Sequence, residues 1–247
     1  MSGHSKWANI KHRKGKQDAL RGKVTTKISR EITIAVRLGG SDPSGNMKLK
    51  LALQKARENN VTKDNIQRAI QKGLGSLEGS NYEEIVYEGY GPNGTAIMVE
   101  ALTDNRNRTA ADVRHLFSKN GGNLGETGCV SWMFKKKGLF IVKKNDVIGE
   151  EDLMMLVLDA GADDFDADED SYEIITEPEA FENVQQVLEA NNIAIETAQI
   201  TMIPDTYVSV SDENAEKMFR FIEILEEHDD VQEVYTNCDL PEEEEED

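Results

Sequence analysis

The chain has 247 residues, with 28 Lys and Arg against 47 Asp and Glu, so its formal net charge at pH 7 is −19. The opposite charges are separated along the sequence. Residues 1–80 contain 17 basic and 6 acidic side chains, a balance of +11, whereas residues 81–247 carry −30. Because phosphates attract cations and are repelled by an acidic surface, only the N-terminal part is suited to contact nucleic acid.

Several classes of protein are disfavoured by what the sequence lacks. No apolar run approaches the roughly 18 residues that a membrane span needs, and no apolar segment follows the basic N-terminus as in a secretory signal. Cys129 and Cys238 are the only cysteines, too few for a disulfide framework or a cysteine-based zinc site. We therefore expect a cytoplasmic protein that makes no membrane contact.

The basic part is predicted to be a three-helix domain. Gly39 ends a first helix, which is indicated by an apolar residue at every fourth position: Leu20, Val24, Ile28, Ile32 and Val36. Asp42 and Pro43 resemble the N-cap and first residue of a second helix. Thr62 is the predicted N-cap of a third helix, which ends at Gly73. The residues from there to position 80 are rich in Gly and Ser, as a linker would be.

Beyond the linker the pattern changes to strands mixed with helices. Strands are predicted at 85–87, 96–102 and 129–134, with a hairpin turn at Asn93-Gly94 and a helix over 107–119. Residues 135–204 then follow the order strand, helix, strand, strand, helix, strand, which is the ferredoxin-like pattern. A last strand, helix and strand are predicted over 206–210, 213–227 and 231–235.

The C-terminal pattern completes a second ferredoxin-like unit only when it is joined to the strands and helix of residues 96–134. We therefore predict an α+β protein in which one ferredoxin-like α/β module is inserted in another. The predicted domains are a basic helical domain at 1–80, a middle domain at 81–134 plus 205–240, an inserted domain at 135–204 and an acidic, disordered tail at 241–247.

The basic N-terminal segment is the main candidate for a functional site. Its cations can each neutralise a phosphate, its histidines can add hydrogen bonds, and its tryptophan can stack on a base or anchor the segment to the helices. The predicted nucleic-acid-binding residues are His4, Lys6, Trp7, Lys11, His12, Arg13, Lys14, Lys16, Arg21, Lys23 and Lys27.

Two arginines in the acidic part form a second candidate site. Arg106 and Arg108 lie near the start of a predicted helix, where they can hold a phosphate or a carboxylate of a partner. The alternative is an internal ion pair with the acidic body. Thr109 and Asp112 have the spacing of a capping box, which explains helix initiation but not the two arginines.

Other motifs do not support a cofactor, a metal or catalysis. Gly89 to Gly94 reads G-x-G-x-x-G, but a strand follows it, so no helix N-terminus is available for a dinucleotide. The alternating aspartates from Asp164 to Asp170 fail the EF-hand register, because position six is Glu169 and position twelve is Ile175. No catalytic motif is evident, so we predict a protein that is not an enzyme and has no cofactor or metal site.

Five segments of the chain resemble signature blocks of the YebC/PmpR family. These segments are residues 3–14, 87–92, 104–109, 121–125 and 230–235. The resemblance implies three domains around a large cleft in a bacterial cytosolic protein. Members are described as DNA-binding transcriptional regulators, and others as translation factors that act on ribosomes, including a mitochondrial translational activator. None is described as an enzyme.

We therefore predict a non-enzymatic nucleic-acid-binding regulator of gene expression, with DNA as the first candidate for the target. A ribosomal-RNA-binding translation factor is the alternative, since the sparse aromatics favour reading of shape and backbone. A module whose acidic domains bind a basic protein is the third interpretation. The cations of the first domain are spread over its predicted helices, so the sequence does not identify a recognition helix.

Overall fold

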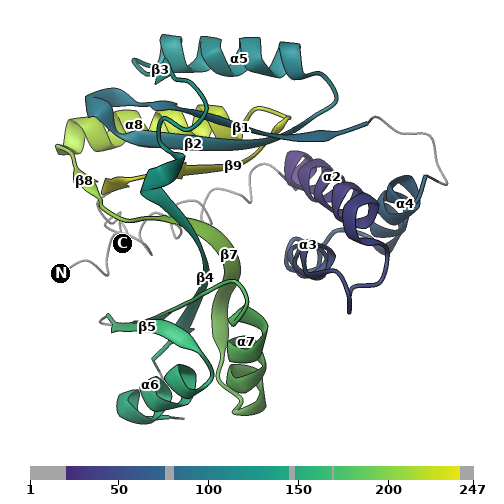
Figure 1. Cartoon of the computed structure of the whole chain (residues 1–247), viewed down its shortest axis with the longest axis vertical. Coiled ribbons are helices and arrows are strands. Elements are labelled where there is room, and N and C mark those ends of the chain that lie inside the picture. The colour runs from purple at the N-terminus through teal and green to yellow at the C-terminus, as the bar shows by residue number, and fades with distance from the viewer. Residues whose placement is uncertain (1–20, 76–80, 145–147, 169, 240–247) are drawn as a thin grey trace. The chain divides into compact units, whose positions relative to one another are not determined.

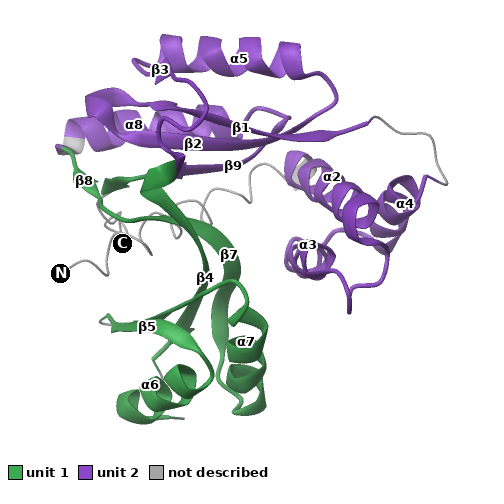
Figure 2. Cartoon of the chain, viewed as in Figure 1, with its two compact units in different colours: residues 1–12, 132–210, 237–247 green, residues 13–131, 211–236 purple. Residues whose placement is uncertain are grey.

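The computed structural model describes residues 21–75, 81–144, 148–168 and 170–239 (Figure 1). In this part the chain forms two compact units (Figure 2). One unit comprises residues 132–210 and 237–239, and the other comprises residues 21–131 and 211–236. Helices come first and sheet-rich parts follow, which confirms the predicted α+β class.

The second of these units begins with a helical domain of three helices: α2 (Arg21–Gly39), α3 (Met47–Glu58) and α4 (Lys63–Gly73). Its core confirms the predicted stripe, because Ile28, Ile32 and Val36 of α2 are buried. Alanines of α3 and α4 complete this core, and their small side chains let the helices approach closely: Ala52, Ala56 and Ala69.

The predicted start of the second helix is wrong. Asp42 accepts hydrogen bonds from the N–H and hydroxyl of Ser44 and so forms a local turn. The N-cap is Asn46, which accepts from the N–H of Leu49 at 3.1 Å and donates to the carbonyl of Ala35 at 2.7 Å. This buried amide ties the start of α3 to the end of α2, which an aspartate without donors cannot do. Thr62, in contrast, caps α4 as predicted.

The same unit contains a four-stranded antiparallel sheet in the order β3-β1-β2-β9. Two helices, α5 and α8, share its core, in which the rings of Phe117 and Phe221 meet edge to face at 5.1 Å between centroids. The elements are β1 (Glu83–Tyr90), β2 (Ala96–Thr103), α5 (Arg106–Lys119), β3 (Asn123–Leu124), α8 (Asp212–Glu226) and β9 (Val231–Thr236).

Two strand predictions for this sheet are wrong. The segment at 206–210 does not enter the sheet, in which β2 pairs on one side with β1 and on the other with β9. The segment at 129–134 contains a 3₁₀ turn at residues 131–133. The N–H groups of Val130 and Ser131, like that of Gly128 just before the segment, donate to the buried carboxylate of Glu88, and only Phe134 belongs to a strand, the start of β4.

The other unit confirms the predicted ferredoxin-like order of elements. All strand pairs of its sheet are antiparallel, in the order β5-β6-β4-β7, and Phe140 of β4 stacks on Phe181 of α7 with 4.5 Å between centroids. The elements are β4 (Phe134–Lys143), α6 (Glu150–Asp159), β5 (Ala162–Ala167), β6 (Ser171–Thr176), α7 (Phe181–Ala190) and β7 (Ile195–Pro204).

Two short strands accompany this unit. β8 (Val208–Ser209) pairs in parallel with β10 (Cys238–Asp239), so the segment predicted for the middle sheet lies here. Among the described helices, none is both long and apolar enough to cross a membrane.

The end of α4 approaches α2 so closely that only glycine fits at position 73. A Cβ there would lie 2.6 Å from Cβ of Val36 and 2.7 Å from the carbonyl oxygen of Thr33. We predict that Gly73→Ala destabilises the helical domain by about 1–3 kcal/mol through overpacking. Hydrogen exchange of the α2 and α4 amides measures this loss. Gly45→Ala, at an open position, is the control, and equal effects of the two substitutions would contradict the packing argument.

Candidate nucleic-acid interface

Most of the predicted nucleic-acid-binding residues lie outside the described part of the chain: His4, Lys6, Trp7, Lys11, His12, Arg13, Lys14 and Lys16. Their role stays a prediction. Arg21 is the first residue of α2, and Lys23 and Lys27 follow on the same helix. The described helical domain still has twelve Lys and Arg between residues 21 and 75, against four Asp and Glu.

Lys23 and Lys27 contact the C-terminal end of α8. The ammonium group of Lys23 donates to the carbonyl of Glu227 at 3.0 Å, and that of Lys27 donates to the carbonyl of Glu226. A helix C-terminus carries partial negative charge, so both contacts stabilise α8. Burial lowers the pKa of Lys27, although the negative charges of Glu226 and Glu233 oppose that shift. Both lysines therefore have partners inside the protein that compete with phosphate.

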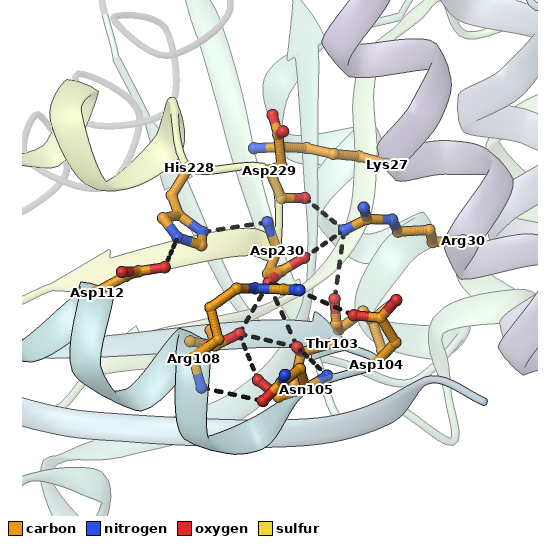
Figure 3. Close-up of polar contacts among 12 residues, drawn as sticks. Lys27, Arg30, Thr103, Asp104, Asn105, Arg108, Asp112, His228, Asp229 and Asp230 are labelled. Carbon is orange, nitrogen blue, oxygen red and sulfur yellow. Dashed lines mark hydrogen bonds and ion pairs between the residues drawn. The ribbon is translucent and has the colours of Figure 1, made fainter. Parts of the chain in front are cut away.

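Asp230, between α8 and β9, is the centre of a buried polar network (Figure 3). Its side chain is 4% exposed. One carboxylate oxygen, Oδ1, accepts from Nη1 of Arg30 at 2.8 Å. The other, Oδ2, accepts from Nη2 of Arg108 at 2.7 Å and from the hydroxyl of Thr109 at 2.7 Å. Asp230 thus joins α2 of the helical domain to α5 of the sheet domain.

Arg30 makes further contacts to the same region. Its Nη1 lies 2.7 Å from the carbonyl oxygen of Asp229, and its guanidinium lies over the ring of Tyr82, 5.1 Å from the centroid. The N–H of Asp230 donates to Nδ1 of His228 at 3.2 Å, and the other ring nitrogen lies 3.3 Å from a carboxylate oxygen of Asp112 on α5. These contacts extend the network along both sides of Asp230 (Figure 3).

Two threonines and a helix cap set the position of Arg108. The N-cap of α5 is Asn105, whose side chain accepts from the N–H of Arg108 at 3.1 Å, so the predicted capping box of Thr109 and Asp112 is wrong. Thr109 instead uses its hydroxyl inside the network, 2.8 Å from that of Thr103. The Thr109 hydroxyl therefore bonds to the buried carboxylate of Asp230 and does not cap the N–H groups at the helix start.

Arg108 and Arg106 differ in what their side chains contact. Nη2 of Arg108 pairs with Asp104 at 3.0 Å as well as with Asp230, which is the internal ion pair that the sequence left open. The Arg106 side chain is 68% exposed and lies 4.0 Å from Glu83, at the limit of an ion pair. Contact of these arginines with a phosphate or a partner stays a prediction, and Arg106 is the more accessible of the two.

The electrostatics of the network favour an ionised Asp230. Burial, the largest influence, pushes its pKa upward, but hydrogen bonds from Arg108, Thr109 and Arg30 outweigh burial and hold the pKa below its ordinary value. The hydrogen bonds to Asp230 and Asp104 in turn raise the pKa of Arg108. Asp230, Arg30 and Arg108 therefore form an ion triad in which both shifts favour the charged forms.

A second ionic contact joins α3 to the sheet. The ammonium group of Lys55 lies 3.0 Å from Glu31 of α2 and 2.9 Å from Glu233 of β9. Burial opposes the charge of Lys55, but the two carboxylates raise its pKa above the ordinary value. Lys48 of α3 pairs with Glu84 of β1 at 2.9 Å, in an exposed position where the pair contributes little stability.

Five other cations of the helical domain have exposed side chains. They lie in the last turns of α2 and α3 and along α4. Within the part of the chain that the structure describes, the following cations form no ion pair: Arg37, Arg57, Lys63, Arg68 and Lys72. The domain is therefore neutralised where it meets the sheet and left positively charged elsewhere.

The sequence did not identify Arg30, Lys55 or Asp230 as site residues. Arg30 is one of many cations in its segment, and its partner Asp230 is 200 positions away along the chain. The available signal was the spacing of Arg30, which lies off the apolar stripe of α2 and so faces away from the helical core.

No metal cluster of three or more His, Cys, Asp or Glu occurs among the described residues.

Comparisons with known proteins connect this arrangement with one family along almost the whole chain. The family model described as the TACO1/YebC protein N-terminal domain matches residues 5–76, and that of the TACO1/YebC second and third domain matches residues 82–238. The boundary between the two matches falls between the helical domain and β1.

Curated relatives and a solved structure agree with that result. A "Probable transcriptional regulatory protein" of Pelotomaculum thermopropionicum is 56% identical over 97% of this chain and 99% of its own. One of the same name from Clostridium tetani is 56% identical over 98% and 99%. The crystal structure of a conserved hypothetical protein from Aquifex aeolicus has a TM-score of 0.81 at 45% identity, covering 94% of this chain and 96% of that one.

Removal of the charge of Asp230 tests its place at the centre of the network. We predict that Asp230→Asn destabilises the unit by about 3 kcal/mol or more, because two arginines lose a buried partner. Asp104→Asn removes an exposed partner of Arg108 and is expected to cost less than about 1 kcal/mol. Urea unfolding of the full chain compares the two variants. Equal losses of unfolding free energy would show that Asp230 does not hold the network together.

The depressed pKa of Asp230 also predicts a pH dependence. A carboxyl whose pKa is lower in the folded than in the unfolded state stabilises the fold above its unfolded pKa of about 3.9, and this contribution is lost as the pH falls through the folded value. The difference in unfolding free energy between wild type and Asp230→Asn should therefore shrink below about pH 4. A difference that stays constant from neutral to strongly acidic pH would contradict the assignment.

Proposed function

Because the chain belongs to the TACO1/YebC family, we propose that it is a non-enzymatic regulator of gene expression that binds DNA through its helical domain. Its relatives named "Probable transcriptional regulatory protein" support the regulatory role. The observation that carries the proposal for DNA is the division of the cations in the helical domain.

That division leaves the domain with exposed cations that are available to a polyanion. Cations that face the sheet are held by carboxylates or carbonyl groups, as Arg30 is by Asp230 and Lys55 by Glu233. Cations elsewhere on the domain stay exposed, and exposed like charges repel one another unless an anion neutralises them. The acidic remainder of the chain repels phosphate, so it favours approach of a nucleic acid to the exposed side of the helical domain.

The described ionic clusters support a binding role in place of catalysis. The ionised groups around Asp230 satisfy one another at short distances inside the fold. Catalytic acids and bases usually have a pKa close to the working pH, and the shifts of Asp230 and Arg108 run the opposite way. This cluster is consequently best explained as the joint between two domains.

We expect the N-terminal segment to add to this binding. The combined variant Lys11→Ala, Arg13→Ala and Lys14→Ala should reduce the slope of log affinity against log salt by roughly three for duplex DNA, since each lost phosphate contact removes about 0.9. Fluorescence anisotropy at several salt concentrations measures the slope. The control is a triple variant of exposed lysines in the other unit: Lys135→Ala, Lys136→Ala and Lys143→Ala. If both triple variants keep the wild-type slope, the N-terminal segment is not a contact.

A further inference from the structure

We propose that α3 and α4 form a helix-turn-helix in which α4 is the recognition helix that enters the major groove of duplex DNA. The inference rests on the proposed function and names the surface that reads the DNA. The sequence alone did not single out such a helix, because cations occur on all three helices of the domain.

The connection between the two helices has the length and backbone of this motif. Residues 59–62 join α3 to α4, which fits the short turn of a helix-turn-helix. Asn60 has a φ of 54°, so the turn contains one residue in the left-handed region that is usually reserved for glycine or asparagine. Val61 is buried in the helical core, and its N–H donates to the carbonyl of Ala56 at 2.9 Å. The turn is therefore held both by this backbone hydrogen bond to α3 and by the burial of the Val61 side chain in the core.

The third helix of the domain supports this pair. α2 packs its apolar stripe against both α3 and α4, and its other side is joined to the sheet through Arg30. Lys23 and Lys27 of α2 are likewise occupied at the end of α8. Because α2 is engaged on both sides, and because Lys48 and Lys55 of α3 pair with carboxylates of the sheet, α4 is the helix of this domain whose cations are all left available.

The available face of α4 has the side chains that read base edges. Ile66, Ala69 and Ile70 pack inward. The other positions carry cations and amides together with one acid; Lys63, Asp64, Gln67, Arg68 and Lys72 are exposed and Gln71 is half-buried. Arginine pairs with the two acceptors of guanine, and glutamine pairs with adenine through one donor and one acceptor. A helix that only needed solubility would not require two amides beside unpaired cations.

Helix stability explains only part of this composition. Lys72 lies in the last turn of α4 and Asp64 in the first, where each favours the helix dipole. Lys63 lies at the first position, where a cation is unfavourable, and Arg68 lies near the middle, where the dipole has no effect. Contact with phosphates and bases accounts for both residues.

The geometry favours DNA over RNA as the partner. The major groove of B-form DNA admits an α-helix, whereas that of A-form RNA is too deep and narrow for side chains to read. A recognition helix is therefore useful on duplex DNA and not on duplex RNA. An RNA partner would have to be bound in another way. Preferential binding of RNA would therefore argue against α4 as a recognition helix.

The first test compares Arg68→Ala with Lys48→Ala in the full chain. Each variant removes one exposed cation of the helical domain, but Lys48 is already paired with Glu84. Binding is measured by fluorescence anisotropy with a duplex DNA of random sequence and a duplex RNA of matched length. We expect wild type to bind the DNA, and Arg68→Ala to weaken binding about 8-fold at about 0.1 M salt and to lower the salt slope by about 0.9. Lys48→Ala should bind like wild type.

The second test measures sequence preference. Wild type and the double variant Gln67→Ala, Gln71→Ala are used to select from a randomised duplex DNA library, and circular dichroism confirms that the variant is folded. We expect the salt slope to be unchanged and the sequences selected by wild type to lose their enrichment.

Each other outcome has a distinct meaning. If wild type binds DNA while Arg68→Ala matches Lys48→Ala, or if the double variant selects the same sequences as wild type, α4 is not the recognition helix and the proposed function stands. Equal or tighter binding of wild type to the RNA would also overturn the inference. If wild type binds neither nucleic acid, the proposed function itself fails.

Discussion

The buried carboxylate of Asp230 is the constraint on which the larger unit depends. An ionised group can be buried only when charges and hydrogen bonds replace the water that it loses. Arg30 of α2 and Arg108 of α5 supply that replacement from opposite sides. The contact therefore decides which side of α2 faces the sheet, and it holds a cationic helical domain against an acidic one.

This arrangement has a consequence for function, because it divides the cations of the helical domain. Lys23, Lys27 and Lys55 have partners at the end of α8 or on β9 and are not free to neutralise phosphates. The cations of α4 have no such partners among the described residues, so the charge available to a polyanion is concentrated there. The acidic domain both anchors the helical domain and determines which of its surfaces remains positive.

The sequence predicted those features that local pattern determines. The four-residue stripe of α2, the cap at Thr62 and the ferredoxin-like order of residues 135–204 all follow from spacing within a short segment. What it missed depends on distant partners. Glu88 draws the N–H groups of Gly128, Val130 and Ser131 away from a strand, and Val208 and Ser209 pair with β10 and not with the sheet of β1 and β2. Asp230 is separated from Arg108 by 122 positions and from Arg30 by 200. A periodic pattern within one segment cannot reveal contacts between residues so far apart in the sequence.

Cross-linking in living cells, followed by sequencing of both the DNA and the RNA recovered with the protein, would show whether the helical domain binds DNA in the cell. A protein that presents a recognition helix from a cationic domain should be recovered at discrete promoter sites that share a sequence, without enrichment of ribosomal RNA. Recovery concentrated at a few positions of ribosomal RNA, with no enriched DNA, would contradict the account and would identify a factor that acts on the ribosome.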